Sequence, residues 1–368
     1  MSVVPDRWFI EMEHAQAAKH GQPAPGDVFL SRRVREEGRC VSVLADGLGS
    51  GVKANVLATL TSTMALTFAS RSTDVETVAQ DIMRTLPVCS ERRIGYSTFS
   101  LVEIDPDGSF RLIEYDNPAA LLVRDGSCRD GSVRTSVLDA ALPGASPRQL
   151  SVRTGAVREE DRLVLVSDGV TQAGMGSVQT PLGWGEAALR AFVLERIRRQ
   201  PQVSARELAH AVVEKARAVD GARPRDDITC GVIYFRRPRR LLVVTGPPYD
   251  RSNDAVMAAR VEEFTGRTVL CGGTTAGIVA RELGRPVEIR LDQADAEVPP
   301  MSRMPGVDAV TEGTITLATV ADRLERGEAP GRPPGDGADE VLRLLLDSDV
   351  IEFVVGTRIN DVHQDPAV

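Results

Sequence analysis

The feature that most constrains the fold is an apolar run that ends in an acidic residue and a glycine-rich turn. Residues 41–45 (VSVLA) form the apolar run, Asp46 follows directly, and residues 47–51 (GLGSG) lead into a long segment of small and apolar residues, 52–69. This order is typical of a buried strand followed by a tight turn and a helix. We therefore expect the carboxylate of Asp46 at an exposed edge of a sheet, with bare backbone beside it.

Two further acidic sites flank apolar runs far downstream. Asp168 follows residues 163–167 (LVLVS), and the pair Asp226-Asp227 precedes residues 228–235 (ITCGVIYF). Three strands that each begin or end on an aspartate predict a cleft lined by carboxylates. An isolated Asp-Gly is more often a simple turn.

Gathered carboxylates need cations. Two unit charges about 4 Å apart repel by about 4 kcal/mol at an effective dielectric constant near 20. Oxygen ligands without cysteine or histidine favour Mg²⁺ or Mn²⁺. Two such ions about 4 Å apart activate a water for attack on phosphorus and need no protein nucleophile. The four dispersed histidines of the sequence agree with chemistry of this kind.

Composition limits the class of protein. A length of 368 residues suggests two domains, and a net charge of −8 argues against a nucleic-acid-binding surface. The long segment 52–69 contains Lys53 and Asn55, so we interpret it as a buried helix rather than a membrane span. Residues 1–13 lack the pattern of a signal peptide. We expect a cytoplasmic protein that contacts neither nucleic acid nor membrane.

The basic run 236–240 (RRPRR) marks a change in organisation. We interpret it as a solvated linker in preference to a patch for an acidic partner. Before it, the pattern predicts strands with a few helices, including helices after two capping pairs, Thr73/Glu76 and Ser204/Glu207. After it, strands and helices alternate as in an α/β domain. The expected domains are 1–236 and 241–368.

The motifs resemble a known family. Gly26-Asp27, residues 45–54 (ADGLGSGVKA), Ser167-Asp168-Gly169 and residues 226–229 (DDIT) occur in the order of the SpoIIE-type phosphatases of the metal-dependent protein phosphatase 2C superfamily. The resemblance covers about residues 8–236. It implies an α+β fold, an αββα sandwich with metals at one sheet edge, followed here by a smaller α/β domain.

The resemblance also implies roles for individual residues. Asp46 would bridge two Mn²⁺ or Mg²⁺ ions with help from the carbonyl of Gly47, Asp168 and Asp226 would hold the second ion, and Asp27 would orient a water. Many relatives carry asparagine at the position of Asp227, which makes its side chain less suited to direct ligation. Leu48 replaces a histidine proposed as proton donor in larger members, so the general acid stays unassigned. The helix at 52–69 is either a switch that completes the site or an ordinary core helix.

The second half resembles a narrower group, the hydrogenase-associated SpoIIE-type phosphatases. The matching motifs are residues 245–248 (TGPP), 271–276 (CGGTTA), 310–313 (VTEG) and 355–366. Within them, Gly272, Gly273, Thr274 and Thr275 form a glycine turn before a helix, which either binds an anion such as phosphate or packs tightly without a ligand. Glu312 either lines the same cleft or caps an element.

The leading hypothesis is a metal-dependent phosphatase that removes phosphate from serine or threonine of a protein partner. One alternative is a non-catalytic regulator whose C-terminal domain senses a small ligand. Another is a phosphatase gated by that domain. A homodimer is an open alternative, and the sequence does not identify the phosphoprotein.

Overall fold

The computed structural model describes residues 9–34, 38–69, 97–129, 132–138, 148–289, 301–331 and 336–358. Contacts group residues 8–236 into one compact unit and residues 237–368 into another, here called the N-terminal and C-terminal units. The helix predicted after Thr73 and the motif residues 359–366 lie outside the described residues.

The N-terminal unit contains two antiparallel sheets. In the described part of the chain, the first sheet has the order β1-β11-β10-β6-β7, with β1 (Phe9–Ala17), β11 (Ile228–Arg236), β10 (Arg162–Val166), β6 (Leu121–Arg124) and β7 (Ser127–Arg129). The second has the order β2-β3-β4-β5-β9-β8, with β2 (Asp27–Val34), β3 (Arg39–Gly47), β4 (Ser97–Ile104), β5 (Ser109–Tyr115), β9 (Arg148–Ala156) and β8 (Ser132–Leu138).

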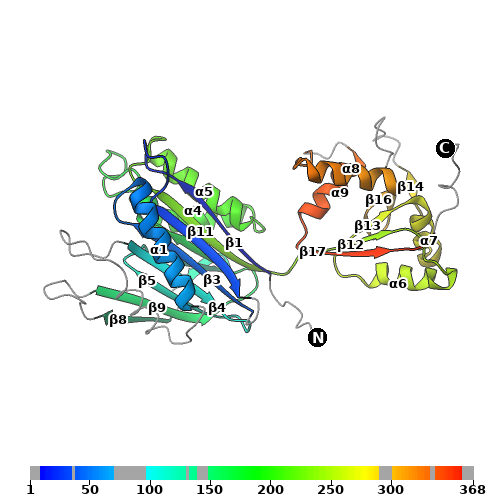
Figure 1. Ribbon diagram of the computed structural model, residues 1–368, viewed down its shortest axis with the longest axis horizontal. Coiled ribbons are helices and arrows are strands. Elements are labelled where there is room, and N and C mark those ends of the chain that lie inside the picture. The colour runs from blue at the N-terminus through cyan, green and yellow to red at the C-terminus, as the bar shows by residue number, and fades with distance from the viewer. Residues whose placement is uncertain are drawn as a thin grey trace. The chain divides into compact units, whose positions relative to one another are not determined.

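The two sheets pack face to face, and helices cover their outer faces (Figure 1). Apolar side chains of both sheets, including Phe29, Leu44, Leu163 and Phe235, form the core between them. The helix α1 (Gly51–Ala69) packs small residues such as Ala58 on the second sheet. The helices α4 (Glu186–Arg199) and α5 (Ala205–Val219) cover the first. The layers are therefore αββα, as the resemblance implied.

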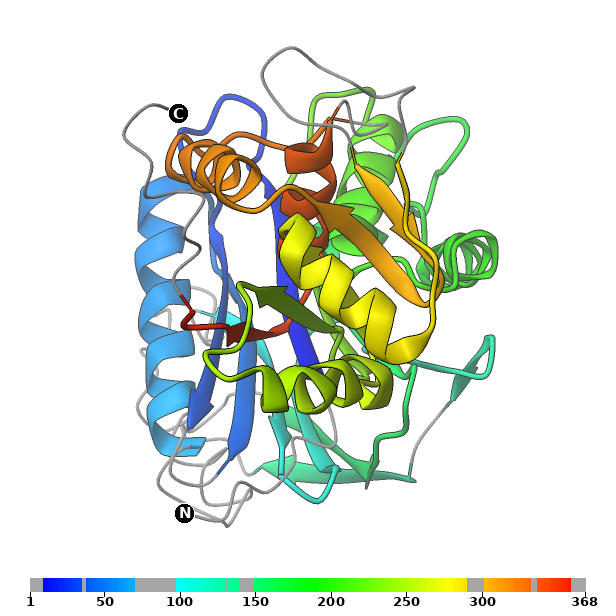
Figure 2. The same ribbon diagram turned by 90° about the vertical axis from the view of Figure 1, so that its right-hand side faces the viewer.

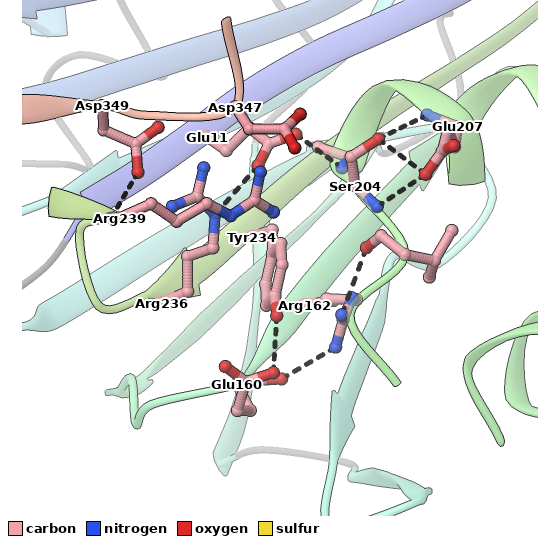
Figure 3. A network of polar contacts seen from close by, with 12 residues as sticks. Glu11, Glu160, Arg162, Ser204, Glu207, Tyr234, Arg236, Arg239, Asp347 and Asp349 are labelled. Atoms are coloured by element: carbon pink, nitrogen blue, oxygen red, sulfur yellow. Dashed lines mark hydrogen bonds and ion pairs between the residues drawn. The ribbon is translucent and has the colours of Figure 1, made fainter. Parts of the chain in front are cut away.

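The helix α5 is fixed to the first sheet at its N-terminus (Figure 3). Ser204 and Glu207 form the predicted capping box, in which each side chain bonds the other's backbone amide. Glu11 on β1 accepts from the amide of Ala205 at 2.8 Å and from the guanidinium of Arg236 at 3.1 Å. These bonds lie away from the acidic strand ends and join helix to sheet.

The C-terminal unit is a three-layer α/β structure around one mixed sheet (Figures 1 and 2). Its strand order is β14-β15-β16-β13-β12-β17, and the last four strands are parallel. The strands are β12 (Arg240–Thr245), β13 (Arg267–Cys271), β14 (Glu288–Ile289), β15 (Ser302–Met304), β16 (Val307–Thr311) and β17 (Val350–Val355). The helices are α6 (Asp254–Glu263) and α7 (Gly273–Leu283) on one face, with α8 (Thr314–Glu325) and α9 (Gly337–Leu346) on the other.

The interpretation of residues 236–240 as a solvated linker was wrong at both ends. Arg236 is the last residue of β11 and is only 5% exposed, because it pairs with Glu11. Arg240 is the first residue of β12, and its guanidinium pairs with Glu352 on β17. Two strands therefore continue into the basic run, and the arginine at each end is paired with a glutamate of its own unit.

No helix in the described ranges combines the length and apolar character needed to cross a bilayer.

Candidate active site

Strand pairing brings the first two aspartates together. In the antiparallel pair β2–β3, Asp27 lies directly opposite Asp46. On the other side of β3, Thr98 on β4 lies opposite Asp46, and the hydroxyl of Ser97 donates to the backbone carbonyl of Asp46 at 2.8 Å. The end of β3 is thus held from both sides, and Asp46 is fixed at the edge of the second sheet.

The first sheet supplies the other two aspartates. Because β10 and β11 are antiparallel, the end of β10 lies beside the start of β11. Asp168 begins the one-turn helix α3 (Asp168–Thr171), and Asp226 stands just before β11. The backbone of Gly169 runs so close to this segment that an added Cβ would lie 2.1 Å from the carbonyl oxygen of Asp227. Glycine is therefore needed at this position.

These strand ends open into one cavity of about 730 Å³. Of the predicted site residues, Asp46, Gly47, Asp168 and Asp226 line it, and Asp27 and Asp227 do not. The remaining walls are supplied by Lys19, residues 48–50, Ser97, Thr98, residues 115–118, Thr171 and Gln172. The structure thus brings carboxylates from both sheets, far apart in sequence, to one opening.

The carboxylates raise one another's pKa. Burial, followed by the charges of Asp27, Asp168 and Asp226, raises the pKa of Asp46 to about 10. Burial and Asp226 raise the pKa of Asp168, and burial raises that of Asp226. Ionising these carboxyl groups together would bring like charges close to one another. A bound cation would offset that repulsion.

Asp27 lies beneath the cavity and is 1% exposed. Burial raises its pKa to about 7; the nearby hydroxyls of Thr229 and Ser167 oppose that shift, and the charge of Asp227 adds to it. Neither hydroxyl reaches hydrogen-bond geometry, so both carboxylate oxygens of Asp27 lack a partner among the described residues. Buried carboxylate oxygens without a partner call for a ligand, a water or a proton.

Asp227 has a different position. Its carboxylate accepts from the backbone amide of Lys19 at 2.8 Å, and it stands within 2.8 Å of where a Cβ on Gly26 would be. It therefore holds the β1–β2 loop against the start of β11. Whether its side chain also contacts a metal ion stays a prediction.

The donor set fits a hard divalent cation. It consists of carboxylate and carbonyl oxygens, which are the ligands that such ions prefer. A positive charge would reduce the repulsion among the carboxylates, and it would also favour the unpartnered oxygens of Asp27. Within the described ranges, no three His, Cys, Asp or Glu side chains already stand in the compact arrangement that would hold a metal ion. Small side-chain rotations would therefore accompany metal binding.

The turn after Asp46 is tightly packed. An added Cβ on Gly47 would lie 2.1 Å from the carbonyl oxygen of Ala54, and Gly51 has a φ of +68°. The start of α1 is thus wedged against the end of β3. Whether α1 acts as a switch stays a prediction.

Sequence reasoning missed three polar residues of the cavity. The amine of Lys19 lies 4.0 Å from a carboxylate oxygen of Asp226. Thr98 and Asn117 hydrogen-bond each other at 2.5 Å on the wall beside Asp46. Thr98 and Asn117 flank apolar runs without a chemical signal of their own, and Lys19 lies in a loop with no recognisable pattern.

The predicted ligand residues of the C-terminal unit also line one cavity. Gly272, Gly273, Thr274, Thr275 and Glu312 share an opening of about 820 Å³. It lies at the carboxyl ends of β12, β13 and β16, where α7 and α8 begin.

Comparison with known proteins identifies the N-terminal unit. The family model of stage II sporulation protein E (SpoIIE) matches residues 36–236. A structure of the PP2C phosphatase domain with a fragment of the regulatory domain of SpoIIE from Bacillus subtilis is 19% identical, with a TM-score of 0.50, over 62% of this chain and 64% of that chain. This likeness shows a PP2C-like fold.

Two other solved structures are similar at lower TM-scores. The RsbU and RsbW domains of a Mycobacterium tuberculosis protein give 20% identity and a TM-score of 0.46, over 70% of this chain and 67% of that one. The catalytic domain of the serine/threonine phosphatase PstP in complex with two manganese ions gives 16% identity and a TM-score of 0.40, over 62% of this chain and 100% of that one. Among curated protein sequences, none matches. Because the family model covers more than half of its length, the chain belongs to the stage II sporulation protein E (SpoIIE) family.

Proposed function

We propose that this chain is a protein serine/threonine phosphatase that depends on Mn²⁺ or Mg²⁺. The observation that carries the proposal is the convergence of Asp46, Asp168 and Asp226 on one cavity, with Asp27 directly opposite Asp46. A carboxylate cluster with so little positive charge of its own is built to bind cations. Family membership supports the assignment.

Four groups would hold two metal ions. Asp46 and the carbonyl of Gly47 lie at the end of β3, and Asp168 and Asp226 face them from the first sheet. Bound there, such ions would lower the pKa of a water and polarise the phosphoryl oxygens. Gln172 donates to a carboxylate oxygen of Asp168 at 2.9 Å, which restricts the rotation of that ligand.

Asp27 would position the attacking water. Its oxygens are buried and have no partner among the described residues, so they are available to accept a hydrogen bond from a water. The general acid for the leaving alcohol stays unassigned.

Lys19 would bind the phosphate. Among the described residues that line the cavity it is the one cation, and its side chain is 38% exposed, so the amine can move from Asp226 toward a ligand. A lysine binds phosphate as a point charge, without the two-pronged geometry of an arginine.

Exposed apolar side chains near the cavity fit a protein substrate. The loop that follows Gln172 exposes Val178 fully and Leu182 by 86%. Neither side chain lines the cavity, but large exposed apolar side chains on a loop that begins there suit contact with a protein. The phosphoprotein itself, and the link to hydrogenase systems that the narrower resemblance implied, stay predictions.

The test is hydrolysis of an aryl phosphate by the full chain. We expect activity with Mn²⁺ or Mg²⁺, none with a chelator, and a loss of about 10²- to 10³-fold in Asp168→Asn, because one charged ligand is removed. The matched control is Asp125→Asn, in a turn with a φ of +49°, which asparagine tolerates. A wild-type protein that neither hydrolyses the substrate nor binds Mn²⁺ would instead support the non-catalytic alternative.

A further inference from the structure

The cavity of the C-terminal unit lies at the carboxyl ends of strands in a sheet whose order of strand addition reverses along the chain. The chain forms β12, β13 and β16 in one direction across the sheet and then returns to place β17 on the far side of β12. In open parallel sheets, ligands bind outside the carboxyl ends of the strands at such a switch point. The cavity is lined by Thr245 at the end of β12 and Cys271 at the end of β13.

Two helices begin at this cavity without side-chain caps. The cap positions are Gly272 for α7 and Gly313 for α8, and neither helix has a capping side chain. The first intrahelical bond of α7 runs from the amide of Ala276, so the three amides before it have no such partner in the helix. The two turns are in contact, because a Cβ on Gly313 would lie 3.3 Å from the Cα of Gly272.

A buried hydroxyl at the same place lacks a partner. Thr245, Cys271 and Thr311 are paired in register across three neighbouring strands, so their side chains point to the same face. The first two line the cavity, and Thr311 is next in the row. Thr311 is 3% exposed, and its hydroxyl, beside the thiol of Cys271, has no hydrogen-bond partner among the described residues. An unpartnered hydroxyl on the same face of the sheet as the cavity-lining Thr245 and Cys271 indicates a ligand or a water there.

The other walls divide the cavity chemically. Arg358 supplies a cationic side chain, and its backbone amide donates to the carbonyl of Pro247 at 3.3 Å. Ile315 and Leu317 of α8 supply an apolar wall, and Glu312 a carboxylate. A volume of about 820 Å³ is in the range of small-molecule sites.

We propose that this cavity binds a phosphate-bearing small molecule of nucleotide size. The phosphate lies against the amides of α7 and α8 and near Arg358, where two helix N-termini and a cation favour negative charge. The remainder of the ligand packs on Ile315 and donates a hydrogen bond to Glu312. The turn lacks the Gly-Lys-Ser/Thr ending of a P-loop, so the amides rather than a lysine carry the phosphate.

The experiment is calorimetric titration of the full chain with ADP and with inorganic pyrophosphate, in the presence of a chelator. The chelator removes the divalent ions through which the aspartate cavity would bind phosphate. Thr274 is exposed in the first turn of α7, and Thr274→Asp adds a carboxylate that suits a helix N-terminus but repels phosphate. We expect about tenfold or greater loss of affinity, equivalent to about 1.4 kcal/mol.

The control is Asn253→Asp, which adds the same charge at the exposed start of α6, outside the cavity, and should change affinity less than about twofold. Thr311→Val should weaken binding without lowering the melting temperature, because it removes an unpartnered hydroxyl. Failure of both compounds to bind at millimolar concentration, or full affinity in Thr274→Asp, would overturn the proposal. Equal affinities for ADP and pyrophosphate would overturn its nucleotide-sized part.

Discussion

Both units contain a strand, a glycine turn and a helix in succession, but the charges around the turn differ between them. In each, a buried strand ends in a glycine turn that starts a helix, β3 into α1 and β13 into α7. In the N-terminal unit the residue before the glycine is Asp46, whereas in the C-terminal unit it is Cys271. The first turn therefore delivers a carboxylate, and the second delivers only backbone amides. The residue at the strand end contributes to this difference, together with Asp168 and Asp226 in the N-terminal unit.

The glycines of the two turns also serve different purposes. Gly47 is required by packing, because any side chain would collide with the backbone of α1. Gly273 faces open space, with nothing within 4 Å of an added Cβ. Glycine in the first turn permits close contact within the protein, and in the second it leaves room beside the amides.

The largest effect is expected at Asp46, where removing the charge should lower activity but raise stability. Asp46→Asn should lower phosphatase activity about 10³-fold, because a carboxylate proposed to hold the metal ions is lost. The same change should raise stability in a chelator. With a folded-state pKa of about 10, raised by burial and the other aspartates, Asp46 keeps a proton that the unfolded chain loses above its ordinary pKa of 3.8. Its contribution to stability therefore falls as pH rises between these values.

Melting temperatures measured from pH 5 to pH 9 test this reversal. In a chelator, the wild-type protein should lose stability with rising pH more steeply than Asp46→Asn. Added Mn²⁺ should stabilise the wild type, through binding to the folded state alone, and leave the variant unchanged. Equal stabilisation of both proteins by Mn²⁺ would show that Asp46 is no ligand.

The next largest effect contrasts the two glycines. Gly47→Ala should cost about 3 kcal/mol, because its Cβ would lie 2.1 Å from the carbonyl oxygen of Ala54 and α1 would have to move. Gly273→Ala should be neutral or stabilise the fold by about 0.5 kcal/mol, since alanine favours a helix. Urea unfolding of both variants measures the difference, with tryptophan fluorescence for Gly47→Ala because both tryptophans, Trp8 and Trp184, precede residue 237. Circular dichroism follows Gly273→Ala. Similar losses in the free energy of unfolding for the two variants would show that the two glycines do not differ in this way.

A smaller effect is expected from the cation of the acidic cavity. Lys19→Ala should raise KM for a phosphate substrate about tenfold and change kcat by less than about threefold, because a ground-state phosphate contact is lost. Affinity for Mn²⁺ should not fall, since the removed charge opposes that of the metal. The control is Lys215→Ala on the exposed side of α5. A drop in Mn²⁺ affinity would mean that Lys19 acts by holding Asp226 in place.

The family resemblance predicted the sandwich, and strong local signals predicted several of its strands and helices. The apolar runs before Asp46 and Asp168 and the capping pair Ser204/Glu207 are local patterns, and each appears in the structure where expected. Residues 306–326 contain β16 and α8, for which the sequence shows no comparable signal. The glycine at position 313 supplies no capping side chain, so the start of α8 gives no local signal.

The sequence predicted which aspartates stand at strand ends, but not which of them line the same cavity. Aspartates at strand ends are visible in the sequence, but which of them face one opening depends on sheet pairing. Asp227 differs from Asp226 by one position, yet its carboxylate accepts from the amide of Lys19 in the β1–β2 loop and does not line the cavity. Lys19 reaches the cavity through that loop, whose course only the fold determines.

The smallest effect tests whether stability alone could explain the losses expected above. Ser204→Ala removes the cap of α5, away from the acidic cavity, and should cost about 1 kcal/mol. Because the cap contacts none of the residues that line the cavity, kcat should match the wild type at temperatures below unfolding. Ser31→Ala, exposed on β2, is the matched substitution and should change the free energy of unfolding by less than about 0.5 kcal/mol. A large fall in kcat in Ser204→Ala would mean that stability of the N-terminal unit, and not the charge at Asp46, governs activity.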